Sequence, residues 1–277
     1  MLIDAGRNIV DKLDVYAEVY RGNAYVQAKL NDAITTILHS NSIAHDALCS
    51  IGIAAPSMCS AIKSLPHFLN LNLDSIPASL NQRFGVPVVP ISYGAAMGLS
   101  EASKREMVVS LDVYETMISA GFIFDGEVCR FSNSRDDIGH MVIDPHGSMC
   151  RCGNRGCLEA MGSGYAAIRY YTELTSRRVG LSEFTRLVKK GDSLAIRVLD
   201  KCASYISLCL FNLLTIFSPS SIYLGGDFMI GNRPLFELCR ENITQRTHGE
   251  IPVKMPKLKM YSEAYGAGIY AQMKKLI

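Results

Sequence analysis

No run of apolar residues in the 277-residue sequence reaches the roughly 18 residues that a membrane-spanning helix requires. The first ten residues, MLIDAGRNIV, include an aspartate and lack the hydrophobic region of a secretory signal. The formal net charge is only +2, and the lysines and arginines are scattered rather than gathered into a basic stripe. These absences argue against a membrane protein, a secreted protein and a nucleic-acid-binding surface, and we expect a cytoplasmic protein.

Internal repeats, low-complexity tracts and long linkers are also missing from the sequence. A hydrophobic content of 48% allows a sizeable core, and the length suggests two compact units. Nine cysteines, an odd number spread over a long chain, fit reduced thiols and a metal site better than a disulfide framework. Five of them stand among apolar neighbours and are expected in the core: Cys49, Cys59, Cys202, Cys209 and Cys239.

The hydrophobic pattern predicts alternating helices and strands in the first part of the chain. Apolar residues recur at four-residue spacing from Val26 to Leu38, which predicts an amphipathic helix over 23–40. The next predicted elements are buried strands at 50–55 and 86–91 and a helix at 94–103. Strands that alternate with helices favour a mainly parallel sheet.

The second part of the chain is predicted to start with two strands over 107–128, closed by the Asp125-Gly126 turn. A helical stretch from 161 to 217 follows, and its last segment, 193–217, is apolar nearly all round, as in a core or an oligomer interface. A buried strand at 221–226 and a closing helix complete the pattern. We therefore expect two α/β lobes, residues 1–105 with a closing helix at 265–277, and residues 106–264.

The segment 139–160, GHMVIDPHGSMCRCGNRGCLEA, contains the strongest signal for a metal site. Its three cysteines fall within eight residues, and they are Cys150, Cys152 and Cys157. Three thiolates and one imidazole make a tetrahedral zinc site, with the imidazole supplied by His140 or by His146. Gly153 and Gly156 let the backbone fold tightly enough for the sulfurs to converge. Such a zinc ion would be structural, because four protein ligands leave no open position for water.

The same segment resembles the signature of the ROK family, which unites bacterial sugar kinases with sugar-responsive transcriptional repressors. The closest match lies in GH followed by CRCGNRGCLEA, and looser matches are SIGIAAPS, GVPV, SIYLGGDF and YGAGIYAQ. The resemblance favours His140 over His146 as the fourth zinc ligand. It implies a two-lobed, actin-like ATPase (ribonuclease H-like) α/β fold with a zinc-bearing loop and with sugar in the cleft.

By this resemblance, four residues would contact the sugar: Ser92, Asp137, His140 and Glu159. Glu159 would accept sugar hydroxyls, and His140 would both ligate zinc and orient the sugar. The family's Glu-x-Gly-His becomes residues 137–140 here, so that its carboxylate is one methylene shorter. Taken alone, Glu159 and Asp137 are better explained as solvated loop charges, and only their position beside the zinc loop makes a functional role an equally good explanation. His67, in a loop beside the expected cleft, is a weaker candidate.

The residues for phosphoryl transfer depart from the family pattern. Family kinases open a helix with Asn-Asp, whose Asp is the general base, whereas Ser92 and Tyr93 align there. A tyrosine, with an ordinary pKa near 10, is a poor base at neutral pH. The first phosphate loop is not found, and the second aligns with 115–119, where Glu115 adds a negative charge and Met117 blocks close backbone approach. We therefore expect no kinase activity and no bound ATP.

These observations favour a sugar-binding effector domain of a ROK-type transcriptional regulator that binds a sugar or sugar phosphate as a homodimer or tetramer. DNA binding would require a winged helix-turn-helix, for which this chain has no room before its first strand. One alternative is a divergent, glucokinase-like kinase that uses ATP and takes its base from Asp112, Asp136 or Asp137. Another is a structural remnant that binds neither ligand and dimerises through the apolar helix near 200–217.

Overall fold

The computed structural model describes residues 1–56, 75–129 and 137–275. Within these residues the strands pair as β1 with β2, as β3 with β4, and as a five-stranded sheet in the order β7-β6-β5-β8-β9. The strands are β1 (Leu2–Ile3), β2 (Ile9–Asp11), β3 (Ile51–Ala55), β4 (Val88–Ser92), β5 (Met107–Val113), β6 (Ile118–Phe124), β7 (Glu127–Val128), β8 (Ser221–Gly225) and β9 (Val253–Lys254). The α-helices are α1 (Asn23–Ser40), α2 (Ser75–Phe84), α3 (Tyr93–Glu101), α4 (Leu158–Gly162), α5 (Gly164–Thr175), α6 (Leu181–Lys189), α7 (Ser193–Phe217), α8 (Asp227–Gly231), α9 (Arg233–Thr247) and α10 (Ser262–Lys275). The 3-10 helices are η1 (Val19–Arg21), η2 (His45–Ala47), η3 (Asp137–His140) and η4 (Lys259–Tyr261).

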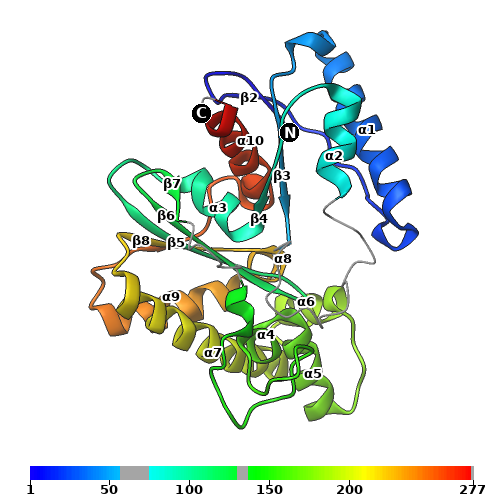
Figure 1. Cartoon of the computed structure of the whole chain (residues 1–277). Coiled ribbons are helices and arrows are strands. Elements are labelled where there is room, and N and C mark those ends of the chain that lie inside the picture. Colours follow the sequence, from blue (N-terminus) through cyan, green and yellow to red (C-terminus); the bar gives the residue numbers. More distant parts are fainter. Residues whose placement is uncertain (57–74, 130–136, 276–277) are drawn as a thin grey trace.

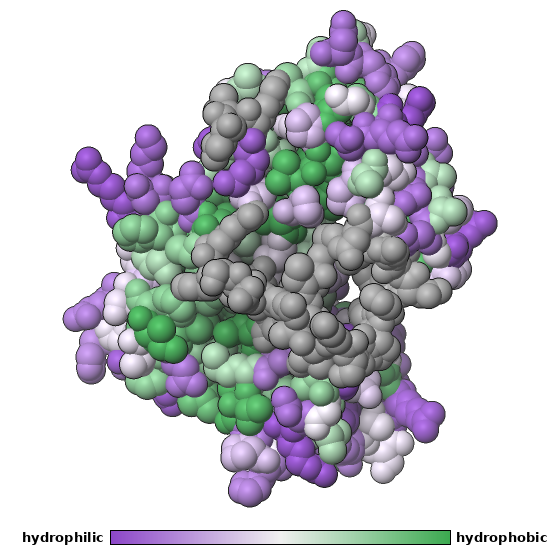
Figure 2. All heavy atoms as spheres, viewed as in Figure 1, coloured by the Kyte–Doolittle hydropathy of each residue, from purple (hydrophilic) through white to green (hydrophobic). Residues whose placement is uncertain are grey.

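The predicted helix over 23–40 is confirmed as α1, and the predicted parallel pairing is confirmed for β3 and β4. β3 and β4 are parallel, with Ile51 opposite Val88. Figure 1 shows α1 and α2 side by side on one side of these strands and α10 on the other. Val26 of α1 and Leu80 of α2 are buried together there. In Figure 2, hydrophilic side chains lie around the outer edge of this part of the molecule, and apolar side chains lie nearer its centre.

The five-stranded sheet lies at the centre of the molecule. β5 runs antiparallel to β6 and parallel to β8, and six of its seven residues are buried. In Figure 1, α7 and α9 cover one side of the sheet, and α3 and α10 lie on the other. A strand that is covered on both faces is apolar along its length, as β5 is except at Ser110 and Asp112. The predicted boundary after residue 105 and the two lobes on either side of it remain predictions.

The strands over 107–128 differ from the prediction. β5 and β6 are joined at residues 114–117, where the Tyr114 N–H donates to the Met117 carbonyl at 2.9 Å. The Asp125-Gly126 turn joins β6 to the short β7 instead. Both turn residues have positive φ, 53° and 77°, as a tight two-residue hairpin turn requires. The turn was therefore predicted at the right residues but assigned to the wrong pair of strands.

The predicted helical stretch from 161 to 217 is interrupted three times in the structure, at Ser163, at 176–180 and at 190–192. α5 ends at Thr175, and the next residue, Ser176, is left-handed with φ 57°. α6 ends at Lys189, shortly before Gly191, which has φ 77°. The Asp192 carboxylate then caps α7 by accepting from the Ala195 N–H at 2.8 Å. α7 itself confirms the predicted apolar helix and packs against α9. None of the described helices combines the length and apolarity that crossing a membrane demands.

The core cysteines were predicted correctly in part. Cys202, Cys209 and Cys239 are buried. The prediction was wrong for Cys49, which is exposed, because the apolar residues beside it in the sequence continue into the strand and do not enclose it. Cys59 lies outside the described residues.

Close packing between α10 and its neighbours depends on glycine. A Cβ atom at Gly266 would lie 1.8 Å from the Ala96 carbonyl oxygen of α3. We expect Gly266→Ala to lower the free energy of unfolding by about 1–3 kcal/mol, because the two backbones must separate. Urea titration measures this change, with Gly231→Ala as the control because a Cβ atom there meets nothing within 4 Å. Equal midpoints for the two variants would contradict the expectation.

Candidate functional site

Four metal-ligating side chains converge in the described part of the chain. They are His140, Cys150, Cys152 and Cys157, and their ligand atoms all lie within 4.8 Å of one another. The Cys150 Sγ is 3.5 Å from the His140 Nδ1, and the Cys152 and Cys157 Sγ atoms are also 3.5 Å apart. A tetrahedral ion with bonds of about 2.3 Å to sulfur separates two sulfurs by about 3.8 Å, whereas a disulfide needs about 2.05 Å. This cluster of free thiols and imidazole can therefore hold a metal ion.

The loop that brings these ligands together is held by its own backbone. The Cys150 N–H donates to the Asn154 carbonyl at 2.8 Å, which closes a tight turn around Cys152. Gly153 and Gly156 have φ of 91° and 68°, so the predicted need for glycine at both positions is confirmed. A Cβ atom at Gly156 would lie 1.5 Å from a backbone oxygen. His140 ends η3 and Cys157 immediately precedes α4, so the ligands come from both sides of the loop.

His146 lies away from the cluster. It is exposed, and its backbone N–H donates to the Asp144 carboxylate at 3.0 Å. Of the two histidines that the sequence offered, the fold brings only His140 to the thiols. Burial raises the pKa of the Cys150 and Cys157 thiols, so both stay protonated near neutral pH unless a cation lies beside them.

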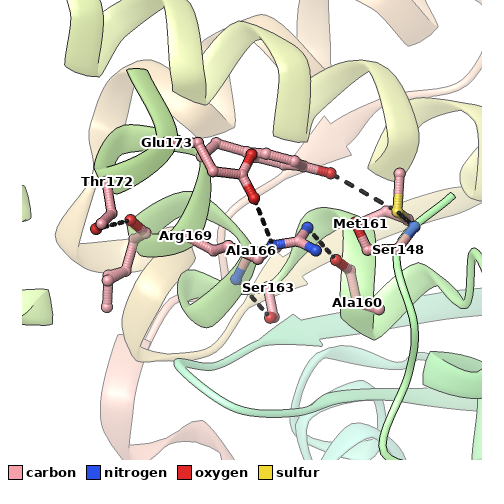
Figure 3. Close-up of polar contacts among 10 residues, drawn as sticks. Ser148, Ala160, Met161, Ser163, Ala166, Arg169, Thr172 and Glu173 are labelled. Carbon is pink, nitrogen blue, oxygen red and sulfur yellow. Dashed lines mark hydrogen bonds and ion pairs between the residues drawn. The ribbon is translucent and has the colours of Figure 1, made fainter. Parts of the chain in front are cut away.

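Residues 140–157, which we call the metal loop, contact α4, and α5 in turn holds α4 in place. Figure 3 shows the Ser148 N–H donating to the Met161 sulfur of α4 at 3.3 Å. Arg169 of α5 donates to the Ala160 carbonyl at 2.9 Å and also faces Glu173. The Ser163 hydroxyl accepts from the Ala166 N–H and caps α5. The loop is thus fixed to the helical layer beneath the sheet.

Glu159 is neither solvated nor in a loop, in contrast to the interpretation that its sequence position alone would suggest. It lies in α4, its side chain is only 9% exposed, and Arg151 binds both of its carboxylate oxygens. The Arg151 Nε lies 2.8 Å from one oxygen, and an Arg151 terminal nitrogen donates to the other at 3.1 Å. A Cβ atom at Gly139 would be 3.4 Å from that second oxygen, so the carboxylate lies against the segment that carries His140. Sequence reasoning missed Arg151, although its position between two candidate ligands was a usable signal.

Ser92 and Tyr93 lie at the junction of β4 and α3. The Ser92 hydroxyl caps α3 by accepting from the Ala95 N–H at 3.4 Å. Burial raises the pKa of Tyr93 to about 12, and the carboxylates of Glu263, Asp227 and Asp112 add to the effect. The tyrosine at the expected base position is therefore protonated at neutral pH.

The start of β6 connects this junction to the metal loop. A Cβ atom at Gly139 would lie 2.8 Å from the Ile118 carbonyl oxygen, so η3 packs directly on the first residue of β6. The next residue, Ser119, accepts from the Gly94 N–H of α3 at 3.0 Å. The fold thus brings Ser92, His140 and Glu159 to one region of the molecule. Asp137 begins η3, and Asp136 and His67 lie outside the described residues.

Acidic side chains gather beside Tyr93. Asp112 of β5 is fully buried, and neither of its oxygens has a hydrogen-bond partner among the described residues. Burial and then the nearby Glu263 carboxylate raise the pKa of Asp112 well above its ordinary value. Glu263 accepts from the Tyr114 hydroxyl at 2.7 Å, and burial raises its pKa too. Asp227 accepts backbone hydrogen bonds from Phe228 and Glu115. Asp227 lies within the quoted SIYLGGDF segment and Glu263 lies two residues before YGAGIYAQ, but neither was singled out, because only the fold brings these carboxylates beside Tyr93.

Comparison with known proteins identifies the family. The sequence matches the ROK family over residues 1–272, so the chain belongs to the ROK family. It is 27% identical over 217 residues to the DNA-binding transcriptional repressor Mlc of Escherichia coli, covering 72% of this chain and 53% of Mlc. The chain spans about half the length of the curated repressors that it matches.

Two solved structures show the same fold. A ROK hexokinase from Thermus thermophilus has a TM-score of 0.77 and 25% identity, over 95% of this chain and 89% of that enzyme. A ROK glucokinase from Streptomyces griseus in complex with glucose and AMPPNP has a TM-score of 0.79 and 19% identity, over 98% and 94% of the two chains. The predicted actin-like ATPase fold is confirmed, and relatives include both repressors and sugar kinases.

Proposed function

We propose that this chain is the sugar-binding effector domain of a ROK-type transcriptional regulator and does not phosphorylate its sugar. The observation that carries the proposal is the state of Tyr93. This residue stands where family kinases have their general base, and its pKa of about 12 leaves it protonated at neutral pH. A protonated hydroxyl cannot accept the proton of an attacking sugar hydroxyl.

The sugar would bind beside the metal loop, against Glu159, His140, Asp137 and Ser92. Glu159 supports this location because its carboxylate is fixed in α4 and lies against the segment that carries His140. Carboxylates accept hydrogen bonds from hydroxyl groups strongly, and Arg151 fixes the orientation of this carboxylate by contacting both of its oxygens. The S. griseus relative was solved with glucose, and we propose a hexose or a hexose phosphate here.

The metal would be a structural zinc ion held by His140, Cys150, Cys152 and Cys157. Three sulfurs and one ring nitrogen suit zinc better than calcium or magnesium, which prefer oxygen ligands. When bound, the ion supplies no open coordination position, and its contribution is to fix the loop. The chain's own residues would then orient the sugar hydroxyls.

The loop at 115–117 supports the absence of phosphoryl transfer. Its Glu115 backbone N–H is taken by the Asp227 carboxylate and does not face a phosphate. Phosphate loops work by pointing free backbone amides and cations at the anion. Acidic groups at this location would repel nucleotide phosphates, so we propose that ATP does not bind.

A sugar kinase is the second candidate, because the T. thermophilus hexokinase resembles nearly the whole chain. Its general base would have to be Asp112, Asp136 or Asp137. Asp112 is a poor choice, since its raised pKa keeps its proton in place and burial removes it from the surface. Only a group that is deprotonated and within reach of the sugar can serve.

The assembly and partners of the protein follow from the regulator proposal. Sugar would bind to a homodimer or tetramer, and contact with DNA would occur through a separate winged helix-turn-helix. The lobes 1–105 with 265–277, and 106–264, would close around the sugar.

Isothermal titration with a panel of hexoses and amino sugars tests the proposal, followed by a coupled assay for ADP release. We expect one sugar to bind, no ADP release above background, and loss of most of the binding heat in Glu159→Gln. Arg155→Gln, on the exposed part of the same loop, serves as the control and should bind like the wild type. ADP release that Asp137→Asn abolishes would establish the kinase instead, and no heat from any sugar would end the effector proposal.

A further inference from the structure

Arg151 connects the cluster of candidate metal ligands to Glu159 of the proposed sugar site. It stands between Cys150 and Cys152 in the sequence, so its backbone is held from both sides wherever those thiols are held. Its guanidinium pairs with both oxygens of Glu159. Two parallel contacts fix the orientation of a carboxylate as well as its position.

The environment of this ion pair makes it more than a surface contact. The Glu159 side chain is 9% exposed and that of Arg151 is 30% exposed. Glu159 also lies against Gly139, the neighbour of His140. The carboxylate is therefore enclosed by segments that carry three of the four candidate metal ligands, His140, Cys150 and Cys152. A change in the course of the loop would move the guanidinium away from the carboxylate.

We propose that Arg151 is a positioning residue that couples metal occupancy to the orientation of the Glu159 carboxylate, and through it to sugar affinity. This coupling rests on the proposed sugar site. With metal bound, the loop holds Arg151 against Glu159, and the carboxylate keeps the orientation in which it contacts the sugar. Without metal, the loop loosens, the bidentate pair is lost, and the carboxylate turns toward other donors.

If bound metal favours the ion pair between Arg151 and Glu159, then by linkage the pair favours metal binding to the same extent. Breaking the pair must therefore weaken metal binding. Outer partners that orient metal ligands are typically worth about 10–100-fold in metal affinity. We expect Arg151→Gln and Glu159→Gln each to weaken zinc binding at least about 10-fold, measured by competition with a chromophoric chelator on the full chain. Arg155→Gln removes the same charge from the same loop without touching the pair, and should leave zinc affinity unchanged.

The second part of the experiment measures sugar affinity with and without chelator, using the hexose from the panel that binds most tightly. Chelation should weaken the binding of this hexose to the wild type, and should have no such effect in Arg151→Gln. Equal zinc affinities in Arg151→Gln and Arg155→Gln would overturn the coupling, as would a sugar affinity that chelation leaves unchanged. If no sugar binds to the wild type, the proposed function fails, and the zinc competition alone still decides whether Arg151 couples the metal loop to Glu159.

Discussion

Treatment with a strong chelator is expected to lower the thermal midpoint of the protein by at least about 10 °C. Structural zinc contributes roughly 10 kcal/mol in small domains, and each kcal/mol shifts the midpoint of a domain of 150–250 residues by about 2–4 °C. Even half of that contribution gives the expected shift. Part of the effect arises because the buried thiols of Cys150 and Cys157 lose the cation that balances them. Differential scanning calorimetry with and without chelator measures it.

Two variants serve as controls for the metal experiment. Cys157→Ser should have a low midpoint that chelator no longer changes, because one of the four ligands is gone. His146→Gln should keep the full chelator response, since His146 is exposed and outside the cluster. A wild-type midpoint that resists strong chelator, in material that contains no stoichiometric transition metal, would contradict the metal site.

Replacing Asp112 is expected to stabilise the protein above neutral pH. The folded protein holds the pKa of this carboxyl above its ordinary value of 3.8, so between the two values the native state binds more protons than the unfolded state. The stability that depends on this proton is fully present below the ordinary pKa, and it is lost as pH rises through the raised one. Asp112→Asn removes the titration, so the variant avoids the cost of keeping a proton on a buried carboxyl above its ordinary pKa, and it should be more stable by about 1–3 kcal/mol at pH 8.

Urea unfolding at pH 5 and pH 8 measures this difference. The wild type should lose more stability between the two pH values than Asp112→Asn does. Asp200→Asn, at an exposed position on α7, makes the same chemical change without burial and should follow the wild type at both pH values. If Asp112→Asn and Asp200→Asn have parallel pH profiles, the buried carboxyl does not carry the proposed linkage.

The metal cluster could be predicted from sequence because its geometry is local. The three cysteines lie within eight residues, and glycines at positions 153 and 156 permit the turns that converge them. Choosing between His140 and His146 needed either the family resemblance or the structure. α1 and α7 could also be predicted, because long apolar patterns with helical spacing have few alternatives.

Features that depend on distant parts of the chain could not be predicted. Glu263 and Asp112 are separated by about 150 residues and meet only because α10 returns to pack on α3. The Arg151 ion pair was hidden for another reason, since a charged loop residue has many solvated alternatives and only the fold reveals its partner. The error at Asp125-Gly126 arose because a turn signal identifies a reversal of the chain and not the strands that it joins.

The most direct measurement is a crystal soaked in a mixture of hexoses and amino sugars, with diffraction data collected across the zinc absorption edge. We expect an anomalous peak among His140, Cys150, Cys152 and Cys157, and in the same crystal a sugar whose hydroxyls contact Glu159. A crystal with no anomalous scatterer at the thiols and no sugar against that carboxylate would contradict it.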